Sequence, residues 1–414
     1  MRLLLLLLAS HALLSFVIVL FRSPPPTSPA VEKQDDLSEQ PPRNGCISIS
    51  TRGFKNSTRW HCPPSYIMIG FPKAGSSSLH RWLLEDSRIV LYKAGRQKEA
   101  HFWHQPTAIV SQTFTSHLHA FPSLSAEDAA SHVLGEHSPG SVWRVPWRCP
   151  RRPSNFGCVG SAAGLSSHNA TAWNIRRFAP VTTKLLVILR DPVRRAYSHY
   201  WHWSEPCREE QPRRTPQCFE ELALRQIALH RNCEQRYNND GSSTNPNHCA
   251  WGALEGDEAW QMTPRMIALG LYVAFLEEWL LVIGRKDRFC VAALDFFLPA
   301  ASPIEPLSGN EGYREASTMA IRRGMNLVGE CLGLGSLSSH QATRQPSYTS
   351  ESAQYVNRRG TASSTPKMLP SSRTLLEEFY APYNARLLDL DLFLGGEARS
   401  SMPLPRWVLP AVRS

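Results

Sequence analysis

Two stretches of this chain consist of a short apolar run followed directly by a pattern typical of a helix. Residues 65–71, SYIMIGF, end at a proline, and residues 76–87 then repeat apolar positions at helical spacing. Residues 184–189, KLLVIL, are followed by a proline turn and a second helical pattern that ends near Trp203. Buried strands that alternate with helices are typical of α/β domains with a parallel sheet. We therefore expect an α/β fold in which helices flank a central parallel sheet.

Two further helical patterns lie in the C-terminal half of the chain. One opens at Pro264, ends at Gly284 and precedes an apolar strand over residues 288–294. The other covers residues 372–394 and contains Pro382. Because proline interrupts a helix interior, we expect two short helices hinged at this residue.

The turn after the first apolar run carries groups that bind anions. It reads GFPKAGSSS, so that Lys73 precedes Gly75 and three serines follow it. A helix N-terminus offers unpaired N–H groups and partial positive charge, glycine allows close backbone approach, and hydroxyls and lysine add donors. The nucleotide-binding loop G-x-x-x-x-G-K-[ST] places its lysine after the glycine, so the order here argues against an ATPase or kinase. A serine-rich helix cap with a solvated lysine is the alternative.

A second anion site is expected after the second apolar run. Arg190 stands at the carboxyl end of an expected parallel strand, where α/β domains bind their ligands. Ser198 follows about two helical turns later, so both side chains are placed to bind one anionic group. The alternative is that Arg190 pairs with Asp191 and that Ser198 is solvated. Two anion sites in one domain predict a ligand with phosphate groups at both ends.

These segments resemble a known family. GFPKAGSSSLHRWL and VILRDPVRRAYSHY are similar to the two donor-binding motifs of the sulfotransferases that use 3′-phosphoadenylyl sulfate (PAPS). KEAHFW (98–103), LGEHSPGSVW (134–143) and later segments (268–280 and 373–390) resemble segments of the Golgi and membrane-bound carbohydrate sulfotransferases, in order and spacing over residues 66–394. Among subfamilies, the motifs look closest to N-acetylgalactosamine 4-sulfate 6-O-sulfotransferase and next to the heparan sulfate sulfotransferases.

The resemblance implies a P-loop-like sulfotransferase fold and assigns a donor site. Lys73 would contact the 5′-phosphate and the leaving oxygen, while Arg190 and Ser198 would bind the 3′-phosphate. NRRG, residues 357–360, is the nearest match to a late nucleotide-binding loop of the heparan branch, and a solvated basic loop is the alternative there. The residues implied to bind the donor are Lys73, Ala74, Gly75, Ser76, Ser77, Ser78, Arg190, Ser198, Arg358, Arg359 and Gly360.

The resemblance also implies an acceptor side. Glu99 is the candidate general base, since sulfuryl transfer needs a group that takes the proton of the attacking hydroxyl. His101 would orient the acceptor or assist the base. Lys98 and Glu136 would bind the acceptor, with Glu136 holding a sugar hydroxyl or buttressing Lys98. A surface carboxylate at Glu99 and a packed core histidine at His101 are the alternatives. The reaction requires no metal.

The N-terminus predicts a membrane anchor. Residues 3–21 contain no Asp, Glu, Lys or Arg, and about 20 apolar residues span a bilayer. We expect an uncleaved signal anchor over residues 1–22, with a cleaved signal peptide as the alternative. A stem rich in Pro and Ser is expected over 23–60, the lumenal sulfotransferase domain over 61–398 and a C-terminal tail over 399–414.

Cysteines and glycosylation sequons favour the secretory pathway. The chain has 10 cysteines, none in CxxC spacing, and an even number behind an export signal favours disulfides over zinc. Cys290, within the apolar RFCVAAL, is instead expected to be a buried free thiol. N-x-[ST] sequons at Asn56 and Asn169 indicate a glycoprotein. We expect a single-pass type II protein of the Golgi membrane with its catalytic domain in the lumen.

The charge balance favours an acidic partner. The net charge is +10 and the pI is about 9.2, and the basic residues form no tract of the kind that binds nucleic acid. We expect an enzyme that transfers a sulfuryl group from PAPS to a hydroxyl of a chondroitin- or dermatan-type or other acidic polysaccharide. The alternatives are a heparan-type sulfotransferase and a non-catalytic glycan-binding relative.

Overall fold

The computed structural model describes most of the chain after residue 44. The described residues are 45–49, 59–92, 99–105, 107–142, 170–203, 214–240, 247–255, 266–298, 310–335, 366–394, 405 and 407–408. They all belong to one compact unit, Pro41–Ser414. Several expected features lie outside the described residues: the signal anchor at 1–22, most of the stem and tail, the sequon asparagines Asn56 and Asn169, Lys98, Arg358, Arg359 and Gly360.

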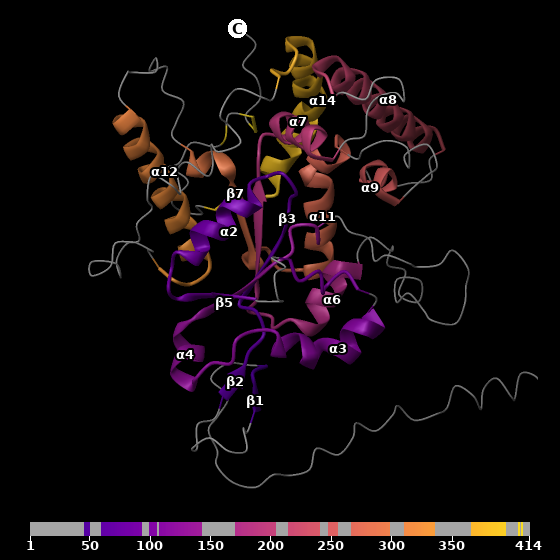
Figure 1. The fold of residues 1–414 in the computed structure, drawn as a ribbon. Helices are drawn as coiled ribbons and strands as arrows, with labels where there is room; N and C mark the ends of the chain where they lie inside the picture. The colour runs from indigo at the N-terminus through magenta and orange to yellow at the C-terminus, as the bar shows by residue number, and fades with distance from the viewer. Residues whose placement is uncertain are drawn as a thin grey trace, which may run out of the picture. The chain divides into compact units, whose positions relative to one another are not determined.

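A five-stranded sheet with the strand order β4-β5-β3-β6-β7 forms the centre of this unit (Figure 1). Its strands are β3 (Tyr66–Gly70), β4 (Ile89–Leu91), β5 (Val133–His137), β6 (Lys184–Leu189) and β7 (Phe289–Ala293). Every neighbouring pair is parallel, so the carboxyl ends of all five strands meet at one edge. The expected α/β class with a central parallel sheet is confirmed.

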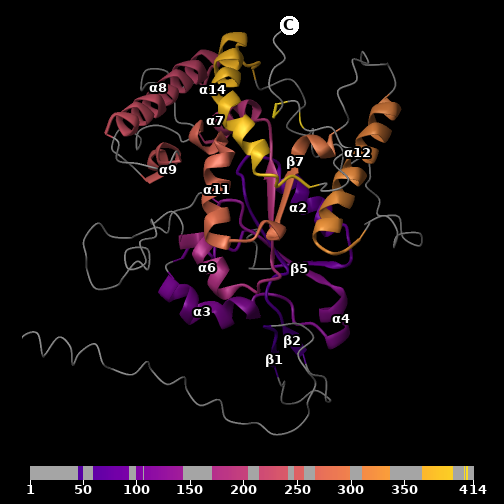
Figure 2. The ribbon, with the colours of Figure 1, turned by 180° about the vertical axis from the view of Figure 1, so that it is seen from behind.

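Helices cover both sides of the sheet, and Figures 1 and 2 show α2 and α12 on one side and α6 and α11 on the other. The described helices are α2 (Ser76–Leu84), α3 (Thr107–His119), α4 (Ala126–Ser131), α6 (Ala170–Phe178), α7 (Pro192–Trp203), α8 (Pro216–Asp240), α9 (His248–Glu255), η2 (Ala268–Gly270), α11 (Tyr272–Ile283), η3 (Lys286–Arg288), η4 (Leu294–Phe297), α12 (Asn310–Cys331) and α14 (Pro370–Asp389). On the first side Trp82 stacks on Phe297, with ring centroids 5.1 Å apart. On the other side Phe71 packs edge-on against Tyr272 at 4.7 Å. Of the helices that the structure describes, none combines the length and apolar character that a membrane span requires.

The hinge expected at Pro382 is wrong, because α14 continues through this residue. Pro382 is exposed, while Phe379, Tyr380 and Leu387 are buried on the opposite stripe of the helix. Packing of that stripe against α8 and α11 holds both halves of the helix in line, despite the hydrogen bond that proline cannot make.

Three disulfides lie within the described residues, and one of them corrects an expectation. They are Cys46–Cys62, Cys233–Cys249 and Cys290–Cys331. Cys290 is buried as expected, but it is not a free thiol, because α12 packs on β7 and brings Cys331 to a Cα–Cα distance of 5.9 Å. The bond therefore ties the edge strand of the sheet to the end of α12.

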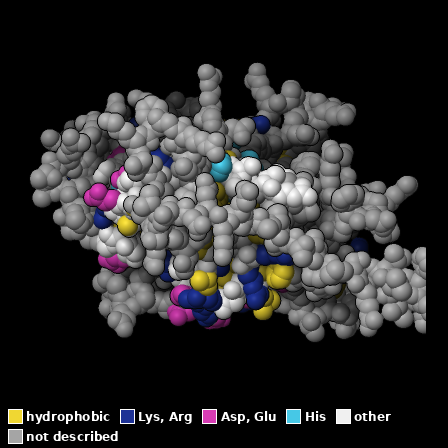
Figure 3. Space-filling view, turned by 90° about the horizontal axis from the view of Figure 1, so that it is seen from below, with side chains coloured by type: hydrophobic (Ala, Val, Ile, Leu, Met, Phe, Trp, Pro, Cys, Tyr) yellow, Lys and Arg dark blue, Asp and Glu magenta, His cyan; other side chains and the backbone are white. Residues whose placement is uncertain are grey.

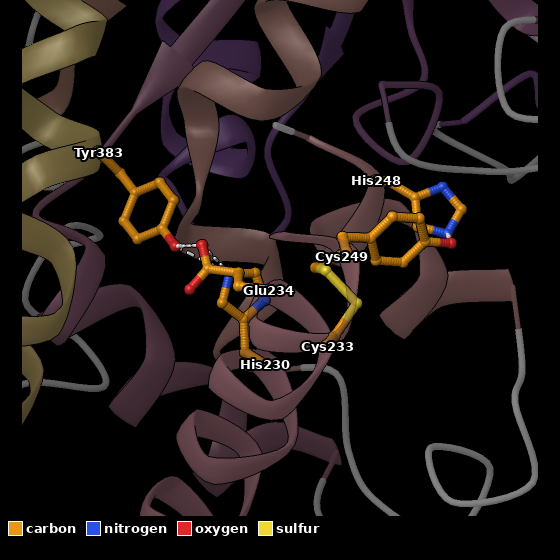
Figure 4. The surroundings of a disulfide bond; sticks show 7 residues. His230, Cys233, Glu234, His248, Cys249 and Tyr383 are labelled. Carbon is orange, nitrogen blue, oxygen red and sulfur yellow. Dashed lines mark hydrogen bonds and ion pairs between the residues drawn. A yellow bond between two sulfur atoms is a disulfide. The ribbon is translucent and has the colours of Figure 1, made fainter. Parts of the chain in front are cut away.

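Helices α8 and α14 are joined by a group of polar contacts close to the Cys233–Cys249 disulfide, which we call the α8–α14 seam (Figure 4). The Tyr383 hydroxyl donates to Glu234 Oε1 at 2.6 Å, and His230 Nε2 lies 2.8 Å from the same hydroxyl. Hydrogen bonding from His230, and to a smaller extent from Tyr383, lowers the pKa of Glu234, and burial raises the pKa of Tyr383. The Cys233–Cys249 bond joins α8 to α9 close by.

The turn before β7, at the amino-terminal edge of the sheet, carries exposed charged side chains. The view from below in Figure 3 shows lysine and arginine side chains beside acidic and hydrophobic ones. At the turn before β7, exposed Arg285 pairs with Asp287 at 2.6 Å, and the neighbouring Lys286 is exposed as well. Lys184, which opens β6, donates to the Asp287 carbonyl at 2.6 Å.

Candidate functional site

The expected anion-binding turn lies between β3 and α2 at the carboxyl edge of the sheet. Lys73 has a φ of 66°, and Gly75, which precedes the first residue of α2, has a φ of 106°. A Cβ atom at Gly75 would come within 2.8 Å of the Leu294 side chain, which follows β7. The backbone angle therefore favours glycine at this position, and a Cβ atom there would also force the Leu294 side chain to move.

The start of α2 offers backbone and hydroxyl donors. Ser78 and Leu79 donate their N–H groups to the Gly75 carbonyl at 3.0 Å, and the N-cap residue, Gly75, has no side chain that could cap this helix end. The first N–H groups of an α-helix lack an acceptor within the helix, so this end attracts an anion. Ser76 is buried and Ser77 is exposed, so the hydroxyls differ in their access to a ligand.

The second anion-binding segment meets the first directly. Arg190 follows β6, and its Nη1 donates to the Lys73 carbonyl at 3.3 Å. The Tyr272 hydroxyl donates to the Arg190 carbonyl at 2.7 Å, which fixes the backbone of this segment. Burial lowers the pKa of Arg190, and a guanidinium with reduced solvation favours an anionic partner. The structure thus brings the two predicted segments to one site.

Asp191 interacts with α7 and with Arg194. Its Oδ1 accepts from Val193 N–H at 2.9 Å, and its Oδ2 lies 3.5 Å from Arg194 Nε. These contacts favour a capping role at the start of α7 over the expected alternative of a pair with Arg190.

Sequence reasoning missed His199, which lies close to Lys73 on the buried side of α7, and its partner Arg195. Ser198, half-buried on α7, is followed by His199, and Arg195 lies one turn earlier on the helix. Arg195 Nη1 donates to His199 Nδ1 at 3.3 Å. Burial, with the charges of Arg195 and Lys73, lowers the pKa of His199 to about 2, so its imidazole is neutral. Their spacing of four residues on a predicted helix could have indicated that the two side chains are neighbours.

The candidate base Glu99 and His101 lie next to each other, close to the carboxyl end of β5. His101 Nε2 lies 3.2 Å from Glu99 Oε2, and each side chain is about one-third exposed (33% and 34%). The His101 N–H donates to Ser138 Oγ at 3.1 Å, and the Ser138 N–H donates to the carbonyl of Met68 in β3 at 2.9 Å. The pair is therefore held at the same edge of the sheet as the anion-binding turn.

Glu136, expected to bind the acceptor, lies fully buried in β5. Its carboxylate accepts hydrogen bonds from Trp103 Nε1 at 2.8 Å, His117 Nε2 at 3.0 Å and Ser138 Oγ at 3.3 Å. Its described contacts are thus with protein groups, and an acceptor contact stays a prediction.

A chain of buried polar groups was not predicted either. The Tyr66 hydroxyl lies 2.9 Å from His137 Nε2, and His137 Nδ1 lies 2.5 Å from Nδ1 of His80 on α2. In a hydrogen bond between two imidazole nitrogens, one nitrogen carries the hydrogen and the other accepts it. The three residues come from β3, β5 and α2, so no local spacing could have indicated the chain.

Within the described residues, no group of three or more His, Cys, Asp or Glu side chains is arranged to hold a metal ion. That the chemistry needs no metal stays an expectation.

Comparisons with known proteins support the resemblance to carbohydrate sulfotransferases. No family model matches the sequence. Carbohydrate sulfotransferase 15 of Mus musculus is 24% identical over 350 residues, and the Rattus norvegicus and Homo sapiens proteins of that name are each 23% identical over 350 residues. Each match covers 80% of this chain and 53% of the relative, so the chain spans about half the length of these curated relatives. A crystal structure of a sulfotransferase from Alicyclobacillus acidocaldarius matches with a TM-score of 0.41 and 20% identity, over 79% of this chain and 95% of that one.

Proposed function

We propose that this protein is a carbohydrate O-sulfotransferase that transfers a sulfuryl group from PAPS to a hydroxyl of an acidic polysaccharide of the chondroitin or dermatan type. The observation that carries this proposal is the hydrogen bond from Arg190 Nη1 to the Lys73 carbonyl at 3.3 Å. It joins two cationic turns at one edge of the sheet, which suits a donor with phosphate groups at two positions. The similarity to proteins named carbohydrate sulfotransferase 15 supports the glycan acceptor.

The residues at this edge fit the donor. The start of α2 and the Lys73 ammonium would hold the 5′-phosphosulfate, with Gly75 leaving room for its close approach. Arg190 and Ser198 would bind the 3′-phosphate. Because the imidazole of His199 is neutral, the positive charge that faces the donor comes from Lys73 and Arg190.

The proposed reaction is an in-line displacement at sulfur. The acceptor hydroxyl oxygen forms a bond to sulfur while the bond between sulfur and the bridging phosphate oxygen breaks. Glu99 takes the hydroxyl proton, and Lys73 stabilises the negative charge that develops on the departing phosphate. The products are the sulfate ester, adenosine 3′,5′-bisphosphate and one proton.

The cellular setting belongs to the same proposal. An apolar segment at residues 3–21 supports a signal anchor, and the disulfides support an oxidising compartment. We propose a type II protein of the Golgi membrane, with the domain at residues 61–398 in the lumen and N-glycosylation at the sequons. The basic charge of the chain suits an acidic glycan.

An assay of the full chain with labelled PAPS tests the proposed function. We expect label in chondroitin or dermatan chains, and disaccharide analysis of the product would identify the modified sugar and position. Transfer confined to heparan sulfate would support the heparan-type alternative instead. Glycan binding without binding of adenosine 3′,5′-bisphosphate would show a non-catalytic relative. No transfer to any acidic polysaccharide would refute the proposal.

Replacing Arg190 by alanine should weaken binding of adenosine 3′,5′-bisphosphate by about 10- to 100-fold, because hydrogen bonds to charged groups contribute about 1.5–3 kcal/mol. Adenosine 5′-phosphate, which lacks the 3′-phosphate, should bind the variant almost as well as the wild type. Isothermal titration with both nucleotides measures the difference.

The matched control is Arg194→Ala, which removes the same charge from an exposed position on α7. We expect it to change neither affinity by more than about twofold, since exposed ion pairs contribute little. Equal losses for both nucleotides in Arg190→Ala would contradict a contact with the 3′-phosphate and would indicate instead that Arg190 acts by holding the Lys73 turn.

A further inference from the structure

The segment that carries Glu99 and His101 has no regular secondary structure, yet its conformation is specific. His101 has a φ of 51°, in the left-handed region that residues other than glycine rarely adopt. Such a conformation persists only where surrounding contacts impose it. Those contacts therefore set the orientation of the Glu99–His101 pair.

Two residues at the end of β5 supply contacts to this segment. Glu136 and Ser138 are two positions apart, so their side chains lie on the same side of the sheet. Ser138 Oγ accepts from the His101 N–H at 3.1 Å, and Glu136 Oε2 accepts from the Trp103 indole N–H at 2.8 Å. Two side chains spaced by two residues on one segment thus bond two residues with the same spacing on the other.

The Glu136 carboxylate is the centre of these contacts. It is fully buried, and it also accepts from His117 Nε2 at 3.0 Å and from Ser138 Oγ at 3.3 Å. A buried carboxylate without hydrogen-bond donors is strongly unfavourable, so the carboxylate and its donors hold one another in place. The His117 ring also stacks on Phe102, with centroids 3.8 Å apart and planes within 4°.

The C-terminal part of the segment is held by α6. Asn174, fully buried on that helix, donates through Nδ2 to the carbonyls of Trp103 and Gln105, both at 2.9 Å. The backbone before Trp103 is therefore bonded to Ser138, and the backbone after it to α6. The Trp103 side chain itself is bonded to the Glu136 carboxylate.

We propose that Glu136 and His117 are positioning residues that fix residues 99–105, and with them the Glu99–His101 pair, at the carboxyl edge of β5. The catalytic meaning of this role rests on the function proposed above. Glu136 acts through its hydrogen bonds with Trp103 and Ser138.

Two conservative variants test the role without replacing Glu136 itself. Trp103→Phe and His117→Phe each remove one N–H donor to the carboxylate and keep an aromatic ring, so the stack on Phe102 survives in the second. In hydrogen–deuterium exchange on the full chain, we expect amides of residues 99–105 to exchange about ten times faster in each variant, with the sheet unchanged. Turnover at saturating donor should fall about 10- to 100-fold, because small misplacements of a catalytic group are costly. The Kd of adenosine 3′,5′-bisphosphate should stay within about twofold of the wild type, since a donor site built on other elements is untouched.

The matched control is Tyr383→Phe, which removes one donor to the carboxylate of Glu234 on the α8–α14 seam (Figure 4). It should lower thermal stability but change neither turnover nor exchange in residues 99–105. Unchanged exchange in both Trp103→Phe and His117→Phe would overturn the proposal, as would faster exchange with wild-type turnover. If the wild type transfers no sulfate, the proposed function fails, but exchange in residues 99–105 still decides whether the two residues fix the segment.

Discussion

Replacing Lys73 by alanine should lower the turnover of sulfuryl transfer by about 100- to 1,000-fold, the usual cost of removing one group that stabilises developing negative charge. The leaving phosphate gains charge as its bond to sulfur breaks, and Lys73 is the ammonium on the turn expected to hold that group. Binding of adenosine 3′,5′-bisphosphate should weaken much less, because the start of α2 and Arg190 still hold its phosphates. Single-turnover kinetics with saturating PAPS measure the effect.

Replacing Lys73 by alanine should remove the ammonium group without disturbing the backbone of the turn. Its backbone has a φ of 66°, a conformation that is as unfavourable for alanine as for lysine. Its carbonyl, which accepts from Arg190 Nη1 at 3.3 Å, is kept. Lys73→Arg should recover part of the rate, whereas Lys286→Ala removes an equal charge at the opposite edge of the sheet and should change nothing. Equal loss of rate in both alanine variants would mean that net charge, not a contact of Lys73, controls the rate.

The strand–turn–helix units could be predicted from the sequence because each one is encoded locally. β3 is a continuous apolar run and is buried along its whole length. Parallel strands covered by helices on both faces require such runs. Gly75 and Pro192 mark where the following helices begin. The carboxyl-edge positions of Lys73 and Arg190 followed from the same rule, since turns after parallel strands share one edge.

Contacts between distant segments could not be predicted in this way. Glu136 and Trp103 are 33 positions apart, and nothing in either local pattern identifies the other as its partner. For Cys290, the apolar neighbours correctly indicated burial, but burial does not distinguish a thiol from half of a disulfide. The partner Cys331, 41 positions later, comes close only through the packing of α12 on β7. Local patterns therefore indicate which turns lie at the carboxyl edge and which residues are buried, while the pairing of side chains depends on tertiary packing.

Replacing Glu99 by glutamine should lower turnover by about 100- to 10,000-fold, since an amide cannot take the proton that the attacking hydroxyl loses. Glutamine keeps the volume of the side chain and can still bond His101, whose Nε2 lies 3.2 Å from Glu99 Oε2. Binding of adenosine 3′,5′-bisphosphate should not change. Single-turnover kinetics with saturating PAPS measure the rate, and isothermal titration measures the binding.

Two further variants separate a general base from a merely structural carboxylate. Glu234→Gln is the matched control, because Glu234 also pairs with a histidine, His230, at 3.4 Å, but on the α8–α14 seam; it should keep the wild-type turnover. His101→Asn preserves the backbone, since asparagine tolerates the φ of 51°. If this variant loses the rate while Glu99→Gln keeps it, the imidazole takes the proton and the proposed role of Glu99 is wrong. If both variants lose rate but Glu99→Gln loses more, Glu99 is the base and His101 orients it. Loss of the base removes proton transfer itself, whereas loss of an orienting group only misplaces it, so the order of the two losses decides between the two residues.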